Sequence, residues 1–383
     1  MINSDLMRSY NQYKNQQKIG HLQINFLHKL MLSILFFTLI PLSILKLFRF
    51  KIKKSNTLFI LPFRDSEPFI SILDELRTIK ESVIITYPNA LLIFPDILIK
   101  DFYKTFKAQP LWTIKNLDFF GALSLKVSQY YGYKIKYGMS RILLFQEYSF
   151  YSSYLTRVFE YEEGSVYNLM HGFPGKEASF FRFTKCFVWG KYFEDLYIVN
   201  KAEADQFIVA GSIYHEKLLQ QKLEHSKYDI LYVMQGKKYS NDEYVNNIFK
   251  VLKKIQMKSK LKIAIKPHPR YSNDTHIPKY FDTVQVSPVQ AISESKLIIS
   301  HFSTMLLDAQ IMGKHVLAFL PKNKIDLVSY MKDKNIFHNQ DKLYMYLLNF
   351  EFDRKPCTYN SKYTIDFSKN TIKIIASIIE RSK

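Results

Sequence analysis

Residues 263–270 read I-A-I-K-P-H-P-R, and residues 297–308 read L-I-I-S-H-F-S-T-M-L-L-D. Each stretch starts as a short apolar run rich in β-branched residues and then turns polar or charged. Continuous apolar runs of this kind are typical of buried parallel strands, which present side chains to ligands at their carboxyl ends. The two stretches therefore predict two strands of a parallel α/β sheet with a binding site at their ends.

Ser303 follows the second predicted strand and precedes residues 304–312, an apolar stretch that ends at Gly313 and predicts a helix. Serine is a favoured N-cap residue, and the first backbone N–H groups of a helix attract anions. Thr304 adds a second hydroxyl at the same point. We expect Ser303 and Thr304 to bind a phosphate group, and the alternative is that Ser303 only caps the helix.

Three nitrogen-bearing side chains, Lys266, His268 and Arg270, alternate along the end of the first stretch. Pro267 and Pro269 lie between them and restrict the backbone on both sides of the histidine. A fixed imidazole between two cations suits a phosphate or a departing leaving group. These residues, Pro269 included, predict the other half of an anion site, and the alternative is that His268 only hydrogen-bonds its own loop.

The composition sets outer bounds on the function. The chain has 383 residues, of which 47% are hydrophobic, and this is enough for two domains with separate cores. Its two cysteines, Cys186 and Cys357, indicate no disulfide framework and fit a reducing compartment. The formal net charge of +20 predicts attraction to polyanions. The candidates are nucleic acid, an anionic membrane leaflet and a phosphorylated donor.

An uncharged segment, residues 30–45, lies near the start of the chain and precedes a basic cluster at positions 46, 49, 51, 53 and 54. It is shorter than the about 20 residues of a perpendicular spanning helix, and it contains Pro41. We predict an interfacial or re-entrant anchor, peripheral or monotopic, that holds the protein at the cytoplasmic face of the inner membrane. The alternative is a buried core helix.

Short apolar runs alternate with amphipathic stretches from residue 57 onward, a pattern that predicts a mostly parallel α/β architecture. The predicted strands are residues 57–62, 82–87, 91–94, 141–145, 166–170, 186–190, 206–211, 229–236, 261–265, 283–286, 297–300 and 315–320. A charged helical stretch at residues 214–228 separates the strands into two groups. We therefore predict two domains joined by this linker.

The chain is predicted to have three parts. Residues 1–55 form a polar leader with the apolar membrane-associated segment and its basic flank. Residues 56–224 form an N-terminal Rossmann-like acceptor domain, and residues 225–383 form a C-terminal Rossmann-like domain for the nucleotide donor. A final helix at residues 365–381 is expected to pack back across the first domain.

This layout resembles that of the GT-B glycosyltransferases, in which two Rossmann-like domains face each other across a cleft. Within that class the chain resembles bacterial sialyltransferases of the lipooligosaccharide and polysialic-acid families. Those families carry an acidic pair before glycine, a His-Pro dipeptide, and a serine before serine or threonine. The matching residues here are Glu162-Glu163-Gly164, His268-Pro269 and Ser303-Thr304, in the same order.

The resemblance implies an inverting, metal-independent transfer of sialic acid from CMP-sialic acid to an oligosaccharide or lipid-linked glycan, in capsule or lipopolysaccharide synthesis. It implies that Glu163 or Glu162 is the general base and that His268 stabilises or protonates the departing phosphate. Ser303 with Thr304 would hold the donor's phosphate. The alternative among enzymes is transfer of another nucleotide-activated sugar, or of a polyol phosphate from a CDP conjugate.

One departure from the family pattern concerns the acidic pair, because residues 154–164 read as the end of a helix rather than as a strand. The group at the carboxyl end of the following strand is then His171, in H-G-F-P-G-K, and Glu147 after R-I-L-L-F is a further acidic candidate. H-G-x-P with a later His-Pro is similar to the pattern in CDP-glycerol glycerophosphotransferases, which build teichoic acids. The choice of general base stays open among Glu163, Glu162 and His171.

Two further expectations concern cofactors and other classes of function. No D-x-D motif occurs, and an E-F-D at residues 351–353 lies past the last predicted strand, so we predict that no metal and no cofactor take part. A different class would be a non-catalytic basic protein that binds membranes or nucleic acid, with residues 128–137, S-Q-Y-Y-G-Y-K-I-K-Y, as a stacking segment. Because no RNA- or DNA-binding motif accompanies the charge, we expect no nucleic-acid partner.

Overall fold

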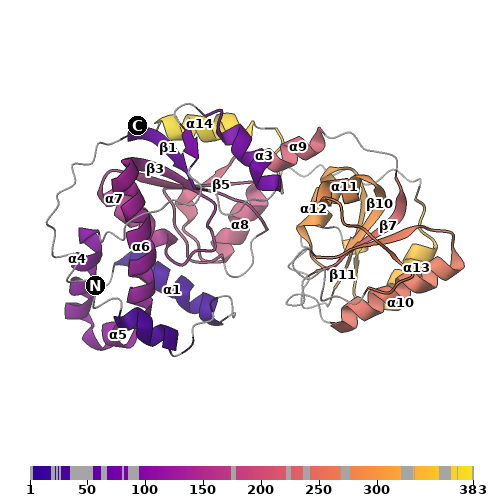
Figure 1. The fold of residues 1–383 in the computed structure, drawn as a ribbon, viewed down its shortest axis with the longest axis horizontal. Coiled ribbons are helices and arrows are strands. Elements are labelled where there is room, and N and C mark those ends of the chain that lie inside the picture. Colours follow the sequence, from indigo (N-terminus) through magenta and orange to yellow (C-terminus); the bar gives the residue numbers. More distant parts are fainter. Residues whose placement is uncertain are drawn as a thin grey trace. The chain divides into compact units, whose positions relative to one another are not determined.

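The computed structural model describes residues 3–18, 22, 25, 27–34, 55–61, 67–79, 82–84, 95–173, 178–220, 226–235, 242–268, 277–320, 331, 333–352, 364–368 and 370–381. The chain divides into two compact units. Unit 1 comprises Met1–Ile213 with Lys362–Lys383, and unit 2 comprises Tyr214–Ser361. Within the described residues each unit contains one six-stranded sheet, and every strand pair is parallel (Figure 1). The predicted α/β class is confirmed.

The sheet of unit 1 has the strand order β2-β1-β3-β4-β5-β6. Its strands are β1 (Ser55–Ile60), β2 (Ser82–Ile84), β3 (Met139–Leu144), β4 (Ser165–Leu169), β5 (Lys185–Val188) and β6 (Phe207–Val209). Because helices cover a parallel sheet on both faces, its strands are apolar throughout rather than alternating. Ile142, Leu143 and Val166 are accordingly excluded from solvent.

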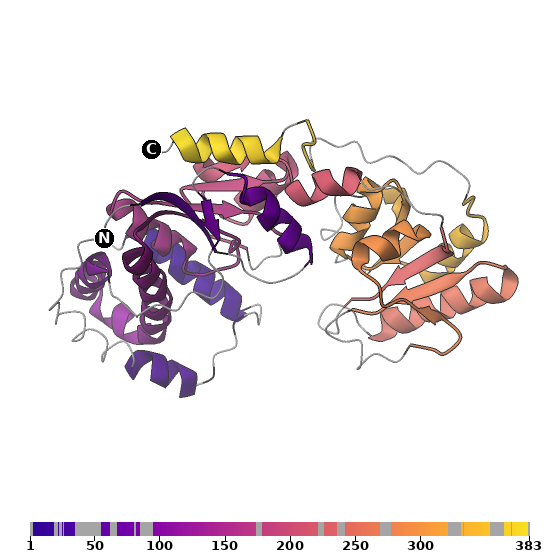
Figure 2. The ribbon, with the colours of Figure 1, turned by 45° about the horizontal axis from the view of Figure 1, so that its top comes forward.

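The helices of unit 1 include α3 (Glu67–Leu76), α4 (Asp96–Ala108), α5 (Pro110–Lys115), α6 (Leu117–Tyr137), α7 (Ser152–Tyr161), α8 (Lys191–Val199) and α14 (Thr371–Arg381). The C-terminal helix α14, drawn in yellow, lies beside the sheet of this unit in both views (Figures 1 and 2). The buried guanidinium of Arg141, on β3, donates to the Ile379 carbonyl at 3.0 Å. This bond ties the end of the chain to the central strand.

The predicted start of the last helix at residue 365 is wrong, because α14 begins at Thr371. The backbone N–H of Asp366 donates to the Trp189 carbonyl at 2.9 Å, and the carboxylate of Asp366 accepts from the Ser368 N–H at 3.0 Å. Such local side-chain bonds compete with helix formation. The residues before α14 are therefore held in an irregular conformation.

The first helix, α1 (Ser4–Lys18), packs against α7 inside unit 1. Asn3 caps it, since its side-chain oxygen accepts from the N–H groups of Asp5 and Leu6 at 3.0 and 3.2 Å. Its buried face is unusually polar. Three of the side chains on that face bond to the rest of the unit: Ser9 with the Tyr154 N–H, Gln12 with the Ser179 N–H, and Tyr13 with the Asp118 carboxylate.

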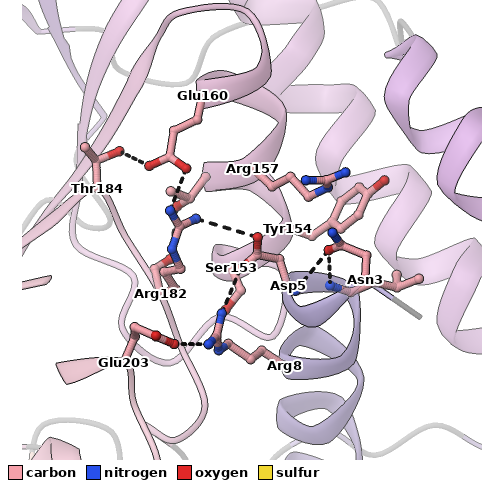
Figure 3. A network of polar contacts seen from close by, with 12 residues as sticks. Asn3, Asp5, Arg8, Ser153, Tyr154, Arg157, Glu160, Arg182, Thr184 and Glu203 are labelled. Atoms are coloured by element: carbon pink, nitrogen blue, oxygen red, sulfur yellow. Dashed lines mark hydrogen bonds and ion pairs between the residues drawn. The ribbon is translucent and has the colours of Figure 1, made fainter. Parts of the chain in front are cut away.

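Ion pairs around Arg182 complete the docking of α1 (Figure 3). The Arg182 guanidinium lies 2.6 Å from the Glu160 carboxylate and 3.7 Å from that of Asp5. Arg8 pairs with Asp5 at 3.0 Å and also with Glu203. Residues 3–18 are thus an integrated part of unit 1, held by polar contacts.

The sheet of unit 2 has the strand order β12-β11-β10-β7-β8-β9. Its strands are β7 (Tyr228–Val233), β8 (Ile263–Lys266), β9 (Asp282–Thr283), β10 (Ser295–Ser300), β11 (His315–Phe319) and β12 (Ile336–Phe337). Read in chain order this is the 3-2-1-4-5-6 arrangement of Rossmann domains. Ile230, Ile265 and Leu297 form the centre of its core.

The helices of unit 2 include α10 (Asp242–Lys258), α11 (Pro288–Ser293), α12 (Thr304–Ile311) and α13 (Gln340–Leu348). The predicted helical linker, residues 214–228, forms only the short helix α9 (Ile213–Leu219) within the described residues. The buried imidazole of His215 lies 3.1 Å from the Asp308 carboxylate, and the Tyr214 hydroxyl donates to the same group at 3.3 Å. These contacts dock α9 on α12.

The segment predicted as a membrane anchor is described only in part. Residues 27–34 form a helix, while residues 35–54 lie outside the described residues, as does the predicted strand at 91–94. Among the helices that the structure describes, none is both long and apolar enough to cross a membrane.

Candidate functional site

The strand orders indicate where a ligand is expected in each unit. In parallel α/β sheets ligands bind outside the carboxyl ends of the strands, at the point where the strand order reverses. This switch point lies between β1 and β3 in unit 1, and between β7 and β10 in unit 2. The polar residues after β3 and β4, and those after β8 and β10, are therefore the first candidates.

A histidine and a glutamate meet at this edge of unit 1. Glu147 follows β3, His171 follows the neighbouring strand β4, and Nδ1 of His171 lies 3.0 and 3.1 Å from the two carboxylate oxygens of Glu147. The backbone N–H of His171 also donates to Glu147, at 3.4 Å. Glu147 is fully buried, whereas the His171 side chain retains 15% exposure. The pair is thus anchored inside and reaches solvent through the imidazole.

Asn168 holds the buried carboxylate in place from within β4. Its amide nitrogen donates to Glu147 at 3.2 Å and lies 3.6 Å from the Cys186 sulfur, while its amide oxygen accepts from the Gln146 N–H at 2.7 Å. Burial, and next the negative charge of Glu147, raise the pKa of the Cys186 thiol, so that this cysteine is protonated at neutral pH. The carboxylate therefore lies among neutral donors with His171 as its partner.

Tyr148 contacts the same histidine from the side. Its ring lies edge-on to the imidazole with 5.5 Å between ring centroids, and its hydroxyl donates to the Phe173 carbonyl at 2.9 Å. The side chain of Gln16, on α1, donates to the Tyr148 carbonyl. The ring thus fixes the segment from His171 to Phe173, and α1 supports the ring.

The geometry of this pair suits general base catalysis. A carboxylate that accepts from Nδ1–H selects the imidazole tautomer in which Nε2 carries the lone pair. The charge of Glu147 also stabilises the imidazolium that forms when Nε2 takes a proton. His171 can therefore accept the proton of a hydroxyl nucleophile, with Glu147 orienting the ring.

The acidic pair predicted as a base lies at the other end of β4. Glu162 and Glu163 follow the last residue of α7, and β4 begins directly after Gly164. Glu162 accepts from the Tyr131 hydroxyl at 2.6 Å and pairs with Lys134 at 3.0 Å. Glu163 is exposed, with a positive φ of 57°. The pair therefore belongs to a helix end at the amino edge of the sheet.

Gly164 has a packing reason of its own at this helix end. A Cβ atom there would lie 2.7 Å from the Ser140 carbonyl oxygen, closer than side-chain carbons approach backbone. Its N–H donates to the Phe159 carbonyl at 2.7 Å, which closes α7. The Glu-Glu-Gly pattern is thus accounted for by the turn from α7 into β4.

In unit 2 the first predicted stretch ends as expected at the carboxyl edge. Lys266 is the last residue of β8, is buried, and donates to the Val286 carbonyl. Burial lowers the pKa of this ammonium group. His268 follows in the loop and is half-buried, while Pro269 and Arg270 lie outside the described residues.

The second predicted stretch forms the start of α12. Ser303 is its N-cap, and the hydroxyl accepts from the Met305 N–H at 3.2 Å. Thr304 is the first helical residue and is exposed. The predicted cap and helix are confirmed, with α12 ending at Ile311.

A buried histidine that the sequence analysis did not single out fixes the loop before Ser303. Nε2 of His301 lies 2.9 Å from the Tyr232 hydroxyl, and Nδ1 lies 2.6 Å from the Phe319 carbonyl. Its ring is buried, and burial lowers its pKa. His301 therefore connects β7, β10 and β11 as a neutral residue at the carboxyl edge.

The two predicted halves of the anion site share one edge but not neighbouring strands. β7 lies between β8 and β10, so Lys266 and Ser303 are separated by two strand spacings, about 10 Å. That span is wider than one phosphate group. A nucleotide phosphate with the adjoining ribose or sugar fits it better than a single anion held by all the residues together.

Two remaining expectations concern metal and nucleic acid. Among the residues that the structure describes, no three His, Cys, Asp or Glu side chains gather as ligands for a metal ion, and metal-independent transfer stays a prediction. Residues 128–137 fall in the last turns of α6, where Ser128, Tyr130 and Tyr133 are buried. These two tyrosine rings pack in the core, whereas Tyr131 and Tyr137 of the same segment are partly exposed, and the absence of a nucleic-acid partner stays a prediction.

The chain is similar to known proteins in structure. No family model and no curated protein sequence matches the chain. Methanocaldococcus jannaschii UDP-GlcNAc 2-epimerase, in complex with UDP-GlcNAc and UDP, has 13% identity and a TM-score of 0.50 over 85% of this chain and 99% of that chain. The S. aureus MnaA–UDP structure has 11% identity and a TM-score of 0.54 over 85% and 96%. The wall teichoic acid polymerase TagF, soaked with CDPG, has 12% identity and a TM-score of 0.50 over 94% and 98%.

The fold is of GT-B type. At these identities the likeness concerns the fold alone, and it confirms the predicted pair of Rossmann-like domains. In this GT-B fold the carboxyl edge of unit 1 holds the His171–Glu147 pair. The carboxyl edge of unit 2 holds Lys266, His268 and the start of α12.

Several residues of the site were weakly signalled by the sequence. Glu147 was a lesser candidate, and nothing along the chain paired it with His171, because strand order decides that contact. Asn168 had one signal, since it is a polar residue within the apolar run V-Y-N-L-M. Tyr148 had no signal among the many tyrosines of the chain.

Proposed function

We propose that this protein is a transferase that moves a group from a cytidine-nucleotide donor to a hydroxyl of a cell-surface glycan, with His171 as the general base. The observation that carries the proposal is the contact between His171 and the buried Glu147 at the carboxyl edge of unit 1. A buried carboxylate that orients an accessible imidazole is an arrangement suited to taking a proton from a hydroxyl. The GT-B fold supports a nucleotide-activated donor.

In the proposed reaction Nε2 of His171 takes the proton of an acceptor hydroxyl as its oxygen attacks the donor. Glu147 stabilises the imidazolium through Nδ1. With CMP-sialic acid as donor, the oxygen attacks the anomeric carbon, and the bond from that carbon to the phosphate oxygen breaks. CMP leaves, the anomeric centre is inverted, and the proton passes from His171 to solvent after product release.

The residues at the carboxyl edge of unit 2 are proposed to hold the donor phosphate. Lys266 and His268 supply positive charge and hydrogen-bond donors from the end of β8. The hydroxyls of Ser303 and Thr304 and the N-terminus of α12 supply further donors from the other side of β7. These groups would stabilise the negative charge of the departing CMP. Pro269 and Arg270 are included in this proposal on the sequence alone.

A second donor class is favoured by one specific observation. The Glu162-Glu163 pair, on which the sialyltransferase resemblance depends, lies at the amino edge of β4, whereas His171 lies at the carboxyl edge. The H-G-x-P pattern that contains His171 resembles CDP-glycerol glycerophosphotransferases instead. With a CDP-polyol donor the acceptor oxygen attacks the outer phosphorus, the bond to the bridging oxygen breaks, and CMP again leaves. The TagF structure soaked with CDPG is compatible with this second class.

The reaction is proposed to take place at the cytoplasmic face of the inner membrane. The uncharged run at residues 30–45 and the basic cluster after it support peripheral or monotopic attachment there. An acceptor that is lipid-linked or part of a growing surface polysaccharide would be reached from the same side. Capsule and lipopolysaccharide synthesis are the corresponding processes.

The test is release of CMP by the full chain from CMP-sialic acid and from CDP-glycerol, with and without glycan acceptors. His171→Ala is expected to lower the turnover number by about 10³-fold, because a general base contributes about 10² to 10⁴. Glu163→Gln is the matched control on the exposed helix end and should retain full turnover. The proposal fails if His171→Ala is as active as the parent.

The choice of donor is settled by the same assay. Release from CMP-sialic acid alone supports the sialyltransferase, and release from CDP-glycerol alone supports the polyol-phosphate transferase. UDP-GlcNAc serves as the third substrate, because two structures of this fold contain UDP. Conversion of UDP-GlcNAc without any acceptor would contradict a transferase of either kind.

A further inference from the structure

Two short helices of unit 1 present an apolar surface to solvent. On α4 and α5 the side chains of Tyr103, Leu111 and Ile114 are 64%, 73% and 54% exposed, and Phe106 is exposed as well. Single exposed apolar residues are ordinary, but a contiguous group of large ones marks a binding surface. Figure 1 shows α4 and α5 together beside α6, at the end of unit 1 opposite α14.

The exposed charged residues among positions 100–115 are all basic. Four lysines of this stretch are exposed: Lys100, Lys104, Lys107 and Lys115. The one acidic residue within 100–115 is Asp101, which is buried and paired with Arg157 at 2.9 Å. Apart from Asp96 in the first turn of α4, the exposed charges of these helices are positive, so the surface combines exposed hydrocarbon with positive charge.

The inner side of the same helices is already packed, so the exposed side chains are not part of the core. Phe102 and Trp112 lie edge-on to Phe120 of α6, with ring centroids 5.2 and 5.9 Å apart. Trp112 also contacts Tyr10 of α1 at 4.9 Å. The aromatic layer fixes α4 and α5 on unit 1 and leaves Leu111 and Ile114 pointing outward.

A third apolar strip adjoins this surface. Residues 27–34 form a helix in which Leu27, Leu30, Met31 and Ile34 are all exposed. This helix lies against α6, because a Cβ atom on Gly121 would come within 2.0 Å of the Leu32 carbonyl oxygen. This helix overlaps the uncharged run at residues 30–45, which the basic cluster follows in the sequence.

We propose that the exposed sides of α4, α5 and residues 27–34 form one lipid-binding surface that seats unit 1 on an anionic bilayer. Leu111, Ile114, Tyr103 and Phe106 would enter the acyl boundary, while the lysines contact the anionic headgroups. A second copy of the chain fits less well, because a symmetric contact would bring the same lysines together. Continuity with the uncharged run at residues 30–45 favours the bilayer.

The tryptophans provide a direct test with the full chain. Trp112 is half-buried on α5 between Leu111 and Ile114, and the second tryptophan, Trp189, is only 6% exposed. Vesicles of phosphatidylcholine with phosphatidylglycerol whose acyl chains are brominated should quench the fluorescence of Trp112. Trp112→Phe should abolish the quenching, and Trp189→Phe should retain it. Vesicle binding without quenching of Trp112 would overturn the proposal.

Charge-introducing variants give an independent measurement. Leu111→Glu with Ile114→Glu should weaken partitioning into the same vesicles at least tenfold and leave the thermal midpoint unchanged. Val199→Glu is the matched control, since Val199 is an exposed apolar residue at the end of α8. It should bind as the parent does.

Two outcomes would contradict the lipid surface. Unchanged partitioning of the double variant would exclude α5 from the membrane contact and overturn the single surface proposed. A concentration-dependent dimer that the double variant abolishes, with no vesicle binding, would assign the surface to a second copy. Because no donor or acceptor is present in these experiments, neither outcome bears on the proposed transferase.

Discussion

The two units both contain a six-stranded parallel sheet, but the side chains at the carboxyl edges of the two sheets differ in chemistry. In unit 1 a buried carboxylate, Glu147, contacts the imidazole of His171, an arrangement suited to taking up a proton. In unit 2 the carboxyl edge carries Lys266, His268 and the N-terminus of α12, groups that attract negative charge. In each unit the difference comes from a few residues that directly follow two of the strands. The same type of parallel sheet can therefore position groups with different chemistry.

The largest effect on turnover in this comparison is expected when the carboxylate of unit 1 is changed. Glu147→Gln should lower the turnover number by about 10²- to 10⁴-fold, because the amide can donate to Nδ1 and thereby select the wrong imidazole tautomer. The Michaelis constant for the donor should stay within a factor of two to three, about 0.6 kcal/mol. Steady-state kinetics of CMP release measures both. A large rise in the Michaelis constant with full turnover would remove the distinction between the two edges.

A smaller effect is expected at the helix N-terminus of unit 2. Ser303→Ala should raise the Michaelis constant for the donor by about tenfold, as the loss of one or two hydrogen bonds to a phosphate predicts. It should also cost about 1 kcal/mol of unfolding free energy, because the N-cap of α12 is lost.

Ser287→Ala is the matched control for this prediction. Ser287 caps α11 in the same unit, where its hydroxyl accepts from the Gln290 N–H at 3.2 Å. This variant should lose a similar amount of stability and keep the Michaelis constant of the parent. An equal rise in both variants would mean that donor binding reports only the stability of unit 2.

The ion pairs that dock α1 are expected to contribute to the stability of unit 1. Arg182→Gln should lower the unfolding free energy of unit 1 by about 1 to 3 kcal/mol, since it leaves Glu160 and Asp5 without their shared partner. Arg77→Gln, which breaks the exposed pair with Asp74, should change it by less than about 0.5 kcal/mol. Urea unfolding followed by far-UV circular dichroism measures both. Equal stabilities would show that the ionic docking in Figure 3 contributes nothing.

The smallest expected effect is a pH dependence confined to unit 2. Lys314 donates to the Ser293 carbonyl, and burial lowers its pKa to about 8. Because its pKa is lower in the folded than in the unfolded chain, the unfolded chain binds more protons above pH 8, and stability rises from about pH 8 to pH 10.5. Lys314→Met should reduce this slope of the thermal midpoint. Lys266 contributes in the same direction. If Lys314→Met leaves the slope unchanged, the pH dependence of stability comes from groups other than Lys314.

The sequence predicted most of the sheet because its strands are continuous apolar runs, which helix-covered parallel strands require. The start of α12 was predictable from Ser303, since capping is a local interaction. Two-residue strands such as β12 were not predictable, because so short a pairing depends on its neighbour β11.

The contacts that define the site depend on strand order, which local sequence does not carry. His171 and Glu147 meet because β3 and β4 are neighbours, and β7 separates the two halves of the predicted anion site. Hydrophobic periodicity also missed the role of α1. Its buried face includes Ser9, Gln12 and Gln16 beside Leu6 and Tyr13, and so polar a face looks like that of a solvated helix.

The most direct test of the central claim is calorimetric titration of CMP into the full chain, with His171→Ala and Lys266→Met compared. The two edges have separate roles if His171→Ala binds CMP as tightly as the parent but turns over about 10³-fold more slowly, while Lys266→Met binds CMP at least tenfold more weakly. The account is contradicted if His171→Ala loses CMP binding, or if Lys266→Met binds CMP as the parent does.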